Sequence, residues 1–126
     1  MKMLKILIVD DDPFITELMK MLIGMEGHQP TTINDSTKAF EAAESILPDL
    51  ITLDLMMPGI SGFELCEMLH NDSRFTNTPI LVVSAKDDPA SRERALGLGA
   101  GGYITKPFTV DELMGRINEL TSQHAG

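Results

Sequence analysis

Short apolar runs alternate with longer amphipathic segments along the whole chain. The first run carries four consecutive aliphatic residues, from Ile6 to Val9, and leaves no polar face between them. Continuous apolar runs of this length are typical of strands that are buried on both faces of a parallel sheet. The runs that we predict to be strands are Lys5–Val9, Thr31–Ile33, Leu50–Leu53, Ile80–Val83 and Tyr103–Thr105.

Two of the intervening segments begin with an aspartate followed by a proline, which predicts the start of a helix. At Asp12-Pro13 and at Asp88-Pro89, a carboxylate can cap the helix while proline occupies its first position. We expect the first helix to end at Gly27, and the fourth to weaken and end at Gly97 and Gly99. The apolar stripe that the first helix is expected to turn towards the core is Phe14, Leu18, Met21, Leu22 and Met25.

The other three helices are predicted from their capping residues. The capping box, in which a hydroxyl residue precedes a glutamate by three positions, occurs at Ser61–Glu64 and at Thr109–Glu112, before the third and fifth helices. Asp35 or Ser36 is expected to cap the second helix, which ends before Pro48. The side chains expected to face inward from these helices are Phe40, Ala43, Ile46, Leu47, Phe63, Cys66, Leu69, Val110, Leu113, Ile117 and Leu120.

Five strands that alternate with five helices predict an α/β fold with a single doubly wound parallel sheet. Each crossover between parallel strands is right-handed, and helices must cover both faces of the sheet. The strand order 2-1-3-4-5 places the first and third strands side by side. No linker, repeat or low-complexity segment interrupts the pattern, so residues 1–126 are expected to form one domain.

A polar residue follows each predicted strand. These residues are Asp10 (with Asp11 and Asp12), Asn34, Asp54, Ser84 and Lys106. In open α/β sheets, ligands bind at the carboxyl edge, where strand order reverses. We therefore expect Asp10, Asp11 and Asp54 to be neighbours in space. Carboxylates, a small hydroxyl and a lysine at one edge are the groups needed to hold a divalent metal and a phosphoryl group.

Composition narrows the classes of function. The formal net charge of -9 and the pI near 4.6 argue against nucleic-acid backbone binding as the main activity of this domain. Solubility explains most of the acidic excess, but it does not explain three consecutive aspartates after a strand. Cys66 is the only cysteine, which excludes an internal disulfide and indicates a reducing, cytoplasmic location. The apolar run at the start is too short for a signal peptide, and no stretch approaches a membrane span.

Taken one at a time, most of these residues have simpler interpretations. Asp54 could be an ordinary turn residue, Ser84 a loop hydroxyl and Lys106 a solvated surface charge. Tyr103 by itself indicates packing, and Cys66 is expected to lie in the core. The histidines His28, His70 and His124 follow no metal-ligand spacing and are expected at the surface or at helix ends.

Four motifs together resemble the receiver domains of two-component response regulators, which have a flavodoxin-like fold and include the chemotaxis regulators. The motifs are IVDDD, LDLMMPGISG, VVSAKD and GYITKPF, and they occur in order and at receiver spacing over the whole chain. The resemblance implies that Asp54 accepts a phosphoryl group from a histidine kinase or a histidine phosphotransfer protein. It also implies that Mg²⁺ or Mn²⁺ binds to Asp10, Asp11, Asp54 and the backbone carbonyl of Met56.

The resemblance assigns roles to three further residues. It implies that Ser84 hydrogen-bonds the phosphoryl oxygen, that Lys106 pairs with it, and that Tyr103 changes rotamer on activation. It further suggests a cis peptide bond at Lys106-Pro107. The domain would catalyse its own phosphorylation and dephosphorylation without acting on an external metabolite. It would bind an unknown downstream protein through the fourth helix, fifth strand and fifth helix, where Arg92 could contribute together with Arg94.

Two other classes of protein share this topology or these motifs. A flavodoxin-type cofactor binder would need a loop rich in hydroxyls and glycine after the first strand, but this chain has DDDP there, which would repel phosphate. A degenerate receiver would act only as an interaction scaffold. The complete set Asp10, Asp11, Asp54, Ser84 and Lys106 argues against that alternative. We therefore expect a phosphorylatable receiver domain with no organic cofactor.

Overall fold

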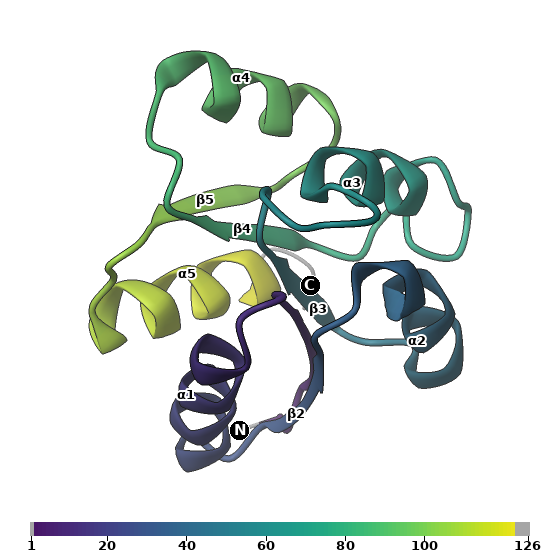
Figure 1. The fold of residues 1–126 in the computed structure, drawn as a ribbon. Helices are drawn as coiled ribbons and strands as arrows, with labels where there is room; N and C mark the ends of the chain where they lie inside the picture. The colour runs from purple at the N-terminus through teal and green to yellow at the C-terminus, as the bar shows by residue number, and fades with distance from the viewer. Residues whose placement is uncertain (1, 123–126) are drawn as a thin grey trace.

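The structure is a computed structural model that describes residues 2–122, and it contains one five-stranded parallel sheet with the order β2-β1-β3-β4-β5 (Figure 1). The predicted fold class and strand order are confirmed. The strands are β1 (Lys5–Val9), β2 (Gln29–Ile33), β3 (Leu50–Leu53), β4 (Ile80–Ser84) and β5 (Gly102–Thr105). The helices are α1 (Pro13–Met25), α2 (Ala39–Ile46), α3 (Gly62–His70), α4 (Pro89–Gly97) and α5 (Val110–Ser122).

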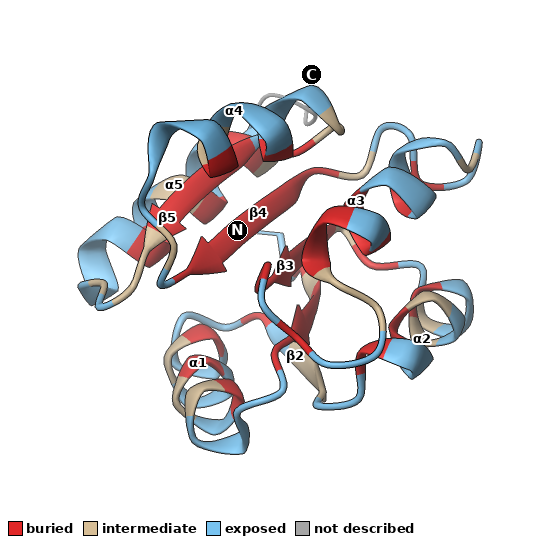
Figure 2. Ribbon diagram, turned by 45° about the horizontal axis from the view of Figure 1, so that its top comes forward, coloured by how far each residue is buried: buried red, intermediate tan, exposed pale blue. Residues whose placement is uncertain are grey.

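Helices cover both faces of the sheet, so β1, β3, β4 and β5 are buried, whereas the edge strand β2 is only partly covered, as Figure 2 shows. Alternate residues of one strand enter two separate cores. From β1, Ile6 and Ile8 pack with α1 and α5, whereas Leu7 and Val9 pack with α2, α3 and α4. Since neither face of β1, β3 and β4 is solvated, their side chains are almost all apolar, which explains why these sequences lack a polar alternation. The edge strand β2, with the sequence QPTTI, has no fully buried residue.

The helix starts follow the predicted capping residues. The Asp12 carboxylate accepts a hydrogen bond from the Phe14 amide at 2.9 Å, and Asp88 accepts one from the Ser91 amide at 3.0 Å. Neither Asp35 nor Ser36 caps α2 directly, because the residue before α2 is Lys38, which makes no side-chain cap hydrogen bond. The Asp35 side chain accepts from Thr37, and a 3₁₀ turn over Ser36–Lys38 precedes α2.

The second strand is longer than predicted. It begins at Gln29 rather than at Thr31 and therefore includes Pro30. Proline lacks an amide proton and is tolerated in edge strands. β2 is an edge strand that pairs only with β1, with Pro30 opposite Ile6.

The predicted core-facing stripe of α1 is wrong at Phe14, Met21 and Met25, although Leu22 packs against the core as expected. Phe14, Met21 and Met25 are 75%, 54% and 77% exposed. The side chains that α1 buries are Thr16, Met19 and Ile23. The helix is apolar on more than one face, so periodicity alone fits two orientations. The orientation adopted lets the Thr16 hydroxyl, although buried, accept a hydrogen bond from Asn34.

The burial of three further side chains can be compared with what the sequence predicted. His28 is buried rather than at the surface, and its Nδ1 accepts a hydrogen bond from the Leu4 amide at 3.1 Å. Val110 is 45% exposed and does not face the core. Cys66 lies in the core as expected, where burial, with a smaller contribution from the Glu67 charge, raises the pKa of its thiol to about 11. His124 lies outside the described residues.

Leu47 also differs from its expected inward position, because it is 56% exposed and adopts a left-handed conformation that ends α2.

Among residues 2–122, no helix is both long and apolar enough to span a bilayer.

The two faces of α1 should respond differently to truncation. Ile23→Ala removes a fully buried side chain and should lower the free energy of unfolding by about 2–5 kcal/mol. Met21→Ala on the exposed face should change it by no more than roughly 0.5 kcal/mol. Urea unfolding followed by circular dichroism measures both. Equal losses in the two variants would contradict this orientation of α1.

Candidate active site

Four strands deliver a polar residue to the same edge of the sheet. Asp10 and Asp54 follow β1 and β3, which are hydrogen-bonded neighbours in the sheet. Ser84 is the last residue of β4, and Lys106 follows β5. A backbone hydrogen bond joins the ends of β4 and β5, because the Lys106 amide donates to the Ser84 carbonyl at 2.8 Å. The reversal of strand order at β1 and β3 thus sets the centre of the site.

Three carboxylates form the core of this site. Oxygen atoms of Asp10, Asp11 and Asp54 all lie within 4.8 Å of one another. Asp10 is 3% exposed and Asp54 is 7% exposed, whereas Asp11 is open to solvent. Asp12 does not belong to the cluster, because its side chain caps α1. Its amide instead donates to Asp10 Oδ1 at 3.0 Å, which fixes the orientation of that carboxylate.

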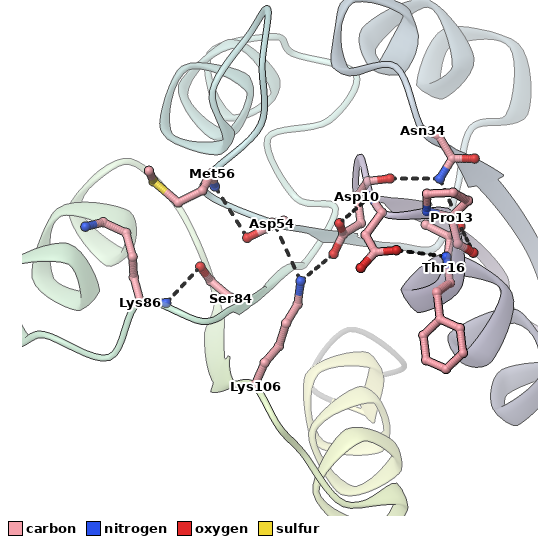
Figure 3. Close-up of polar contacts among 11 residues, drawn as sticks. Asp10, Pro13, Thr16, Asn34, Asp54, Met56, Ser84, Lys86 and Lys106 are labelled. Carbon is pink, nitrogen blue, oxygen red and sulfur yellow. Dashed lines mark hydrogen bonds and ion pairs between the residues drawn. The ribbon is translucent and has the colours of Figure 1, made fainter.

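The Lys106 ammonium lies between two of these carboxylates (Figure 3). Its Nζ is 2.6 Å from Asp10 Oδ2 and 3.5 Å from Asp54 Oδ2. Burial alone would lower the pKa of Lys106, but the hydrogen bond to Asp10 and the charges of Asp54 and Asp10 outweigh it and raise the pKa above its usual value. The side chain is therefore a fixed positive charge at neutral pH. The Lys106-Pro107 peptide bond is cis, as suggested.

The carboxylate cluster has the chemistry of a divalent cation site. Three carboxylates and one ammonium leave two negative charges, which one divalent cation would neutralise. Hard cations such as Mg²⁺ prefer carboxylate and carbonyl oxygens as ligands. Asp10, Asp11 and Asp54 offer the carboxylate oxygens, so the residues present fit such an ion.

Two backbone amides also face polar side chains of the site. The Met56 amide lies 3.4 Å from Asp54 Oδ1, while the Met56 side chain is 59% exposed and points away from the site. The Ser84 hydroxyl is fully buried and accepts from the Lys86 amide at 3.3 Å. Both loops that border Asp54 thus present backbone groups towards the carboxyl edge.

Tyr103 lies inward in this structure. Its ring is 4% exposed and its hydroxyl donates to the Lys86 carbonyl at 2.6 Å. The Arg92 guanidinium stacks 4.6 Å from the centre of the ring. Burial raises the pKa of the phenol, and the positive charge of Arg92 opposes that shift. Arg92 therefore packs against Tyr103 rather than extending into solvent, as charged residues on an exposed helix usually do.

Two polar side chains outside the predicted set position the loops around the site. Asn34 Nδ2 donates at 2.9 Å both to the Asp10 carbonyl and to Thr16 Oγ1. Ser36 Oγ donates to the Pro58 carbonyl at 2.6 Å and accepts from Ile60. Asn34 was placed at the sheet edge from the sequence, but its bracing role was missed. Thr16 gave no signal beyond being a polar residue at a position that is buried, and Ser36 was considered only as a possible helix cap.

Both the sequence and the fold match known proteins. A family model described as the response regulator receiver domain matches residues 6–118. The chain is 37% identical to the DNA-binding dual master transcriptional regulator RpaA of Synechocystis, over 92% of this chain and 48% of RpaA. It is 38% identical to the DNA-binding response regulator MtrA of Mycolicibacterium smegmatis, over 90% of this chain and 48% of MtrA. The chain thus spans about half the length of the curated relatives that it matches.

Solved structures with the same fold include the receiver domain of the Francisella response regulator 1452. It superposes with a TM-score of 0.89 at 32% sequence identity, covering 96% of this chain and 98% of that chain. The similarity therefore extends over the complete sheet and over both layers of helices.

Mg²⁺ should stabilise the fold through the carboxylate cluster, because the three oxygens are brought together only in the folded state. With a dissociation constant on the order of 1 mM, about 10 mM MgCl₂ should add roughly 1.4 kcal/mol to the free energy of unfolding. Asp11→Asn should raise the melting temperature in EDTA, since it removes one repelling charge, and should reduce the gain from Mg²⁺. Melting curves with and without MgCl₂ measure both effects, and curves that do not respond to Mg²⁺ would exclude a metal site here.

Proposed function

The chain belongs to the response regulator receiver family, and from that premise we propose that it accepts a phosphoryl group on Asp54. The observation that carries the proposal is the position of Asp54, which lies beside the Asp10–Asp11 pair on one side and 3.5 Å from the Lys106 ammonium on the other. Outside the Asp10–Asp11 pair, no other aspartate of residues 2–122 lies beside both that pair and the Lys106 ammonium. The donor would be the phosphohistidine of a histidine kinase or of a histidine phosphotransfer protein, in the cytoplasm.

The reaction would be a direct transfer to a carboxylate oxygen. One Asp54 oxygen forms a bond to phosphorus, giving an acyl phosphate, while the bond between phosphorus and the donor imidazole nitrogen breaks. The electron pair of that bond stays with the nitrogen, which then takes up a proton. Since both the carboxylate and the phosphoryl group are anionic, their repulsion is the main barrier that the site has to offset.

The residues around Asp54 are suited to offset that repulsion. Phosphoryl transfer is catalysed mainly by positioning and by charge stabilisation. Lys106 would shift from Asp10 towards the new phosphoryl oxygens, and the Ser84 hydroxyl and the Met56 amide would donate to them. Asp10, Asp11 and Asp54 would hold Mg²⁺ together with the Met56 carbonyl. When bound, Mg²⁺ supplies a positive charge against the phosphoryl oxygens.

The output would leave through α4, β5 and α5, where a downstream protein would bind. A groove of about 490 Å³ lies on this face, and Arg92, Tyr103 and Arg116 are among the residues that line it. Tyr103 connects the groove to the site, because its hydroxyl holds the Lys86 carbonyl two residues after Ser84. Movement of Ser84 towards a phosphoryl group would move Lys86, with which it is hydrogen-bonded, and would alter the Tyr103 contact. The phosphoryl group would act by shifting the population between two states.

Asp54→Asn should abolish phosphorylation. Wild-type protein incubated with acetyl phosphate and MgCl₂ should gain the mass of one phosphoryl group, and EDTA should prevent the gain. Asp12→Asn is the matched control, because asparagine caps a helix about as well as aspartate and Asp12 lies outside the cluster. Intact-mass spectrometry measures the product. Labelling of Asp54→Asn at the wild-type rate would place the acceptor elsewhere, and no labelling of the wild type would favour the scaffold class.

Tyr103 should report the switch directly, because the chain contains one tyrosine and no tryptophan. Beryllofluoride, which mimics a phosphoryl group, should change the tyrosine emission of the wild type. Ser84→Ala should reduce that change while leaving Mg²⁺ binding almost intact, because the hydroxyl that couples the site to Lys86 is lost. An emission that stays constant while Asp54 is fully occupied would rule out this route through Ser84 and Tyr103.

A further inference from the structure

Gly62 begins α3 directly behind the peptide group of Asp54. The chain turns back after β3, and the Gly62 amide donates to the Leu55 carbonyl at 3.0 Å. A Cβ atom at Gly62 would lie 2.6 Å from Leu55 Cα and 2.7 Å from the carbonyl carbon of Asp54, and would overlap the Asp54 carbonyl oxygen. These neighbours are backbone atoms of the proposed acceptor residue and the one after it, so no flexible side chain can move aside.

The backbone conformation of Gly62 does not itself call for glycine. The glycines with positive φ are Gly27, Gly59 and Gly99, and Gly62 is not among them. Within a helix glycine is less favourable than alanine, because it loses more conformational freedom on folding. Alanine at Gly24, in α1, would meet no atom within 4 Å. What Gly62 provides is therefore space beside Asp54.

Neither partner in this contact can easily retreat. α3 is held in the core by the buried side chains Phe63, Leu65, Cys66 and Leu69. On the other side, the Asp54 amide is hydrogen-bonded to the Val9 carbonyl at 3.1 Å. A close-packed core resists displacement of a whole helix. A side chain at position 62 would therefore push mainly on the peptide group that follows Asp54, and so rotate or shift its carboxylate.

We propose that Gly62 is a positioning residue that sets the place of the Asp54 carboxylate relative to Asp10, Asp11 and Lys106. Direct contact with the backbone of the acceptor residue makes the first turn of α3 a support for the site. This role rests on the proposed function of Asp54 as phosphoryl acceptor. It concerns the geometry of the site rather than the formation of the sheet.

Gly62→Ala should slow phosphorylation by acetyl phosphate about 10- to 100-fold, because an acceptor displaced by about 1 Å loses alignment with the phosphoryl group. The variant should also bind Mg²⁺ about tenfold more weakly, since loss of support for a metal ligand has effects of that size. Intact-mass spectrometry gives the rate, and the amide shifts in an NMR titration with MgCl₂ alone give the dissociation constant. The Mg²⁺ titration is carried out on folded protein and does not depend on activity.

Two alanine variants serve as matched controls. Gly24→Ala lies in an open position of α1 and should leave both measurements at wild-type values. Gly99→Ala combines a φ of +113° with a Cβ 2.5 Å from the His70 ring, so it should destabilise the protein far from the site. Gly99→Ala should therefore lower the melting temperature without changing the phosphorylation rate or the Mg²⁺ dissociation constant. This control distinguishes the effect of lower protein stability from the effect of a displaced Asp54 carboxylate.

The outcomes distinguish the two proposals. Phosphorylation of wild type and Gly24→Ala at equal rates would support the proposed function, whereas no phosphorylation of either would overturn it. A Gly62→Ala variant that is only less stable, with wild-type rate and Mg²⁺ affinity, would overturn the positioning role. If Gly62→Ala does not fold, the measurement is repeated in a background carrying Gly24→Ala and Gly115→Ala, both at open helical positions. Failure to fold there as well would make Gly62 a requirement of the fold and would also overturn the positioning role.

Discussion

The site depends on holding like charges close together at the carboxyl edge of the sheet. Two unit charges 4 Å apart repel by about 4 kcal/mol at an effective dielectric constant near 20. Asp10 and Asp54 are nearly buried, so water screens them little, and Lys106 is the cation placed between them. The ammonium lies closer to Asp10 than to Asp54, which leaves the Asp54 carboxylate the less tightly paired of the two. Further positive charge at this position would therefore lower the repulsion between the carboxylates.

The rest of the fold keeps those charges in place. The sheet is packed on both faces, so a strand cannot slide without disturbing two cores. Side-chain hydrogen bonds then fix the loops that leave the strands: Asn34 holds the carbonyl of Asp10, and Ser36 holds the loop after Asp54. At Gly62 there is no space for a side chain, and the first turn of α3 lies directly against the backbone of Asp54 and Leu55. The energy of apolar packing thereby supports an arrangement of charges that would repel one another in the unfolded chain.

The helix that would carry the output is held differently from the others. α4 buries only Ser91 and Ala95, so few apolar contacts fix its position. Two arginines of this helix lie over aromatic rings, Arg92 over Tyr103 at 4.6 Å and Arg94 over Phe63 at 4.0 Å. Cation–π contacts at partly exposed positions contribute only about 0.5–1 kcal/mol each. An element with so little buried apolar surface can change position at low free energy, as a switching surface requires.

The sequence by itself determined the fold class and the residues at the sheet edge, because these follow from local signals: apolar runs, aspartate caps and the polar residue after each strand. The order 2-1-3-4-5 is one of the common orders of a doubly wound sheet, so it was expected from the fold class rather than from those signals. It did not determine which face of α1 is buried, since an apolar stripe fits two orientations and only packing against β1, β2 and α5 selects one. It also missed the burial of His28 and the bracing roles of Asn34 and Ser36. Hydrogen bonds of that kind join residues more than twenty positions apart, so only the tertiary structure could decide them.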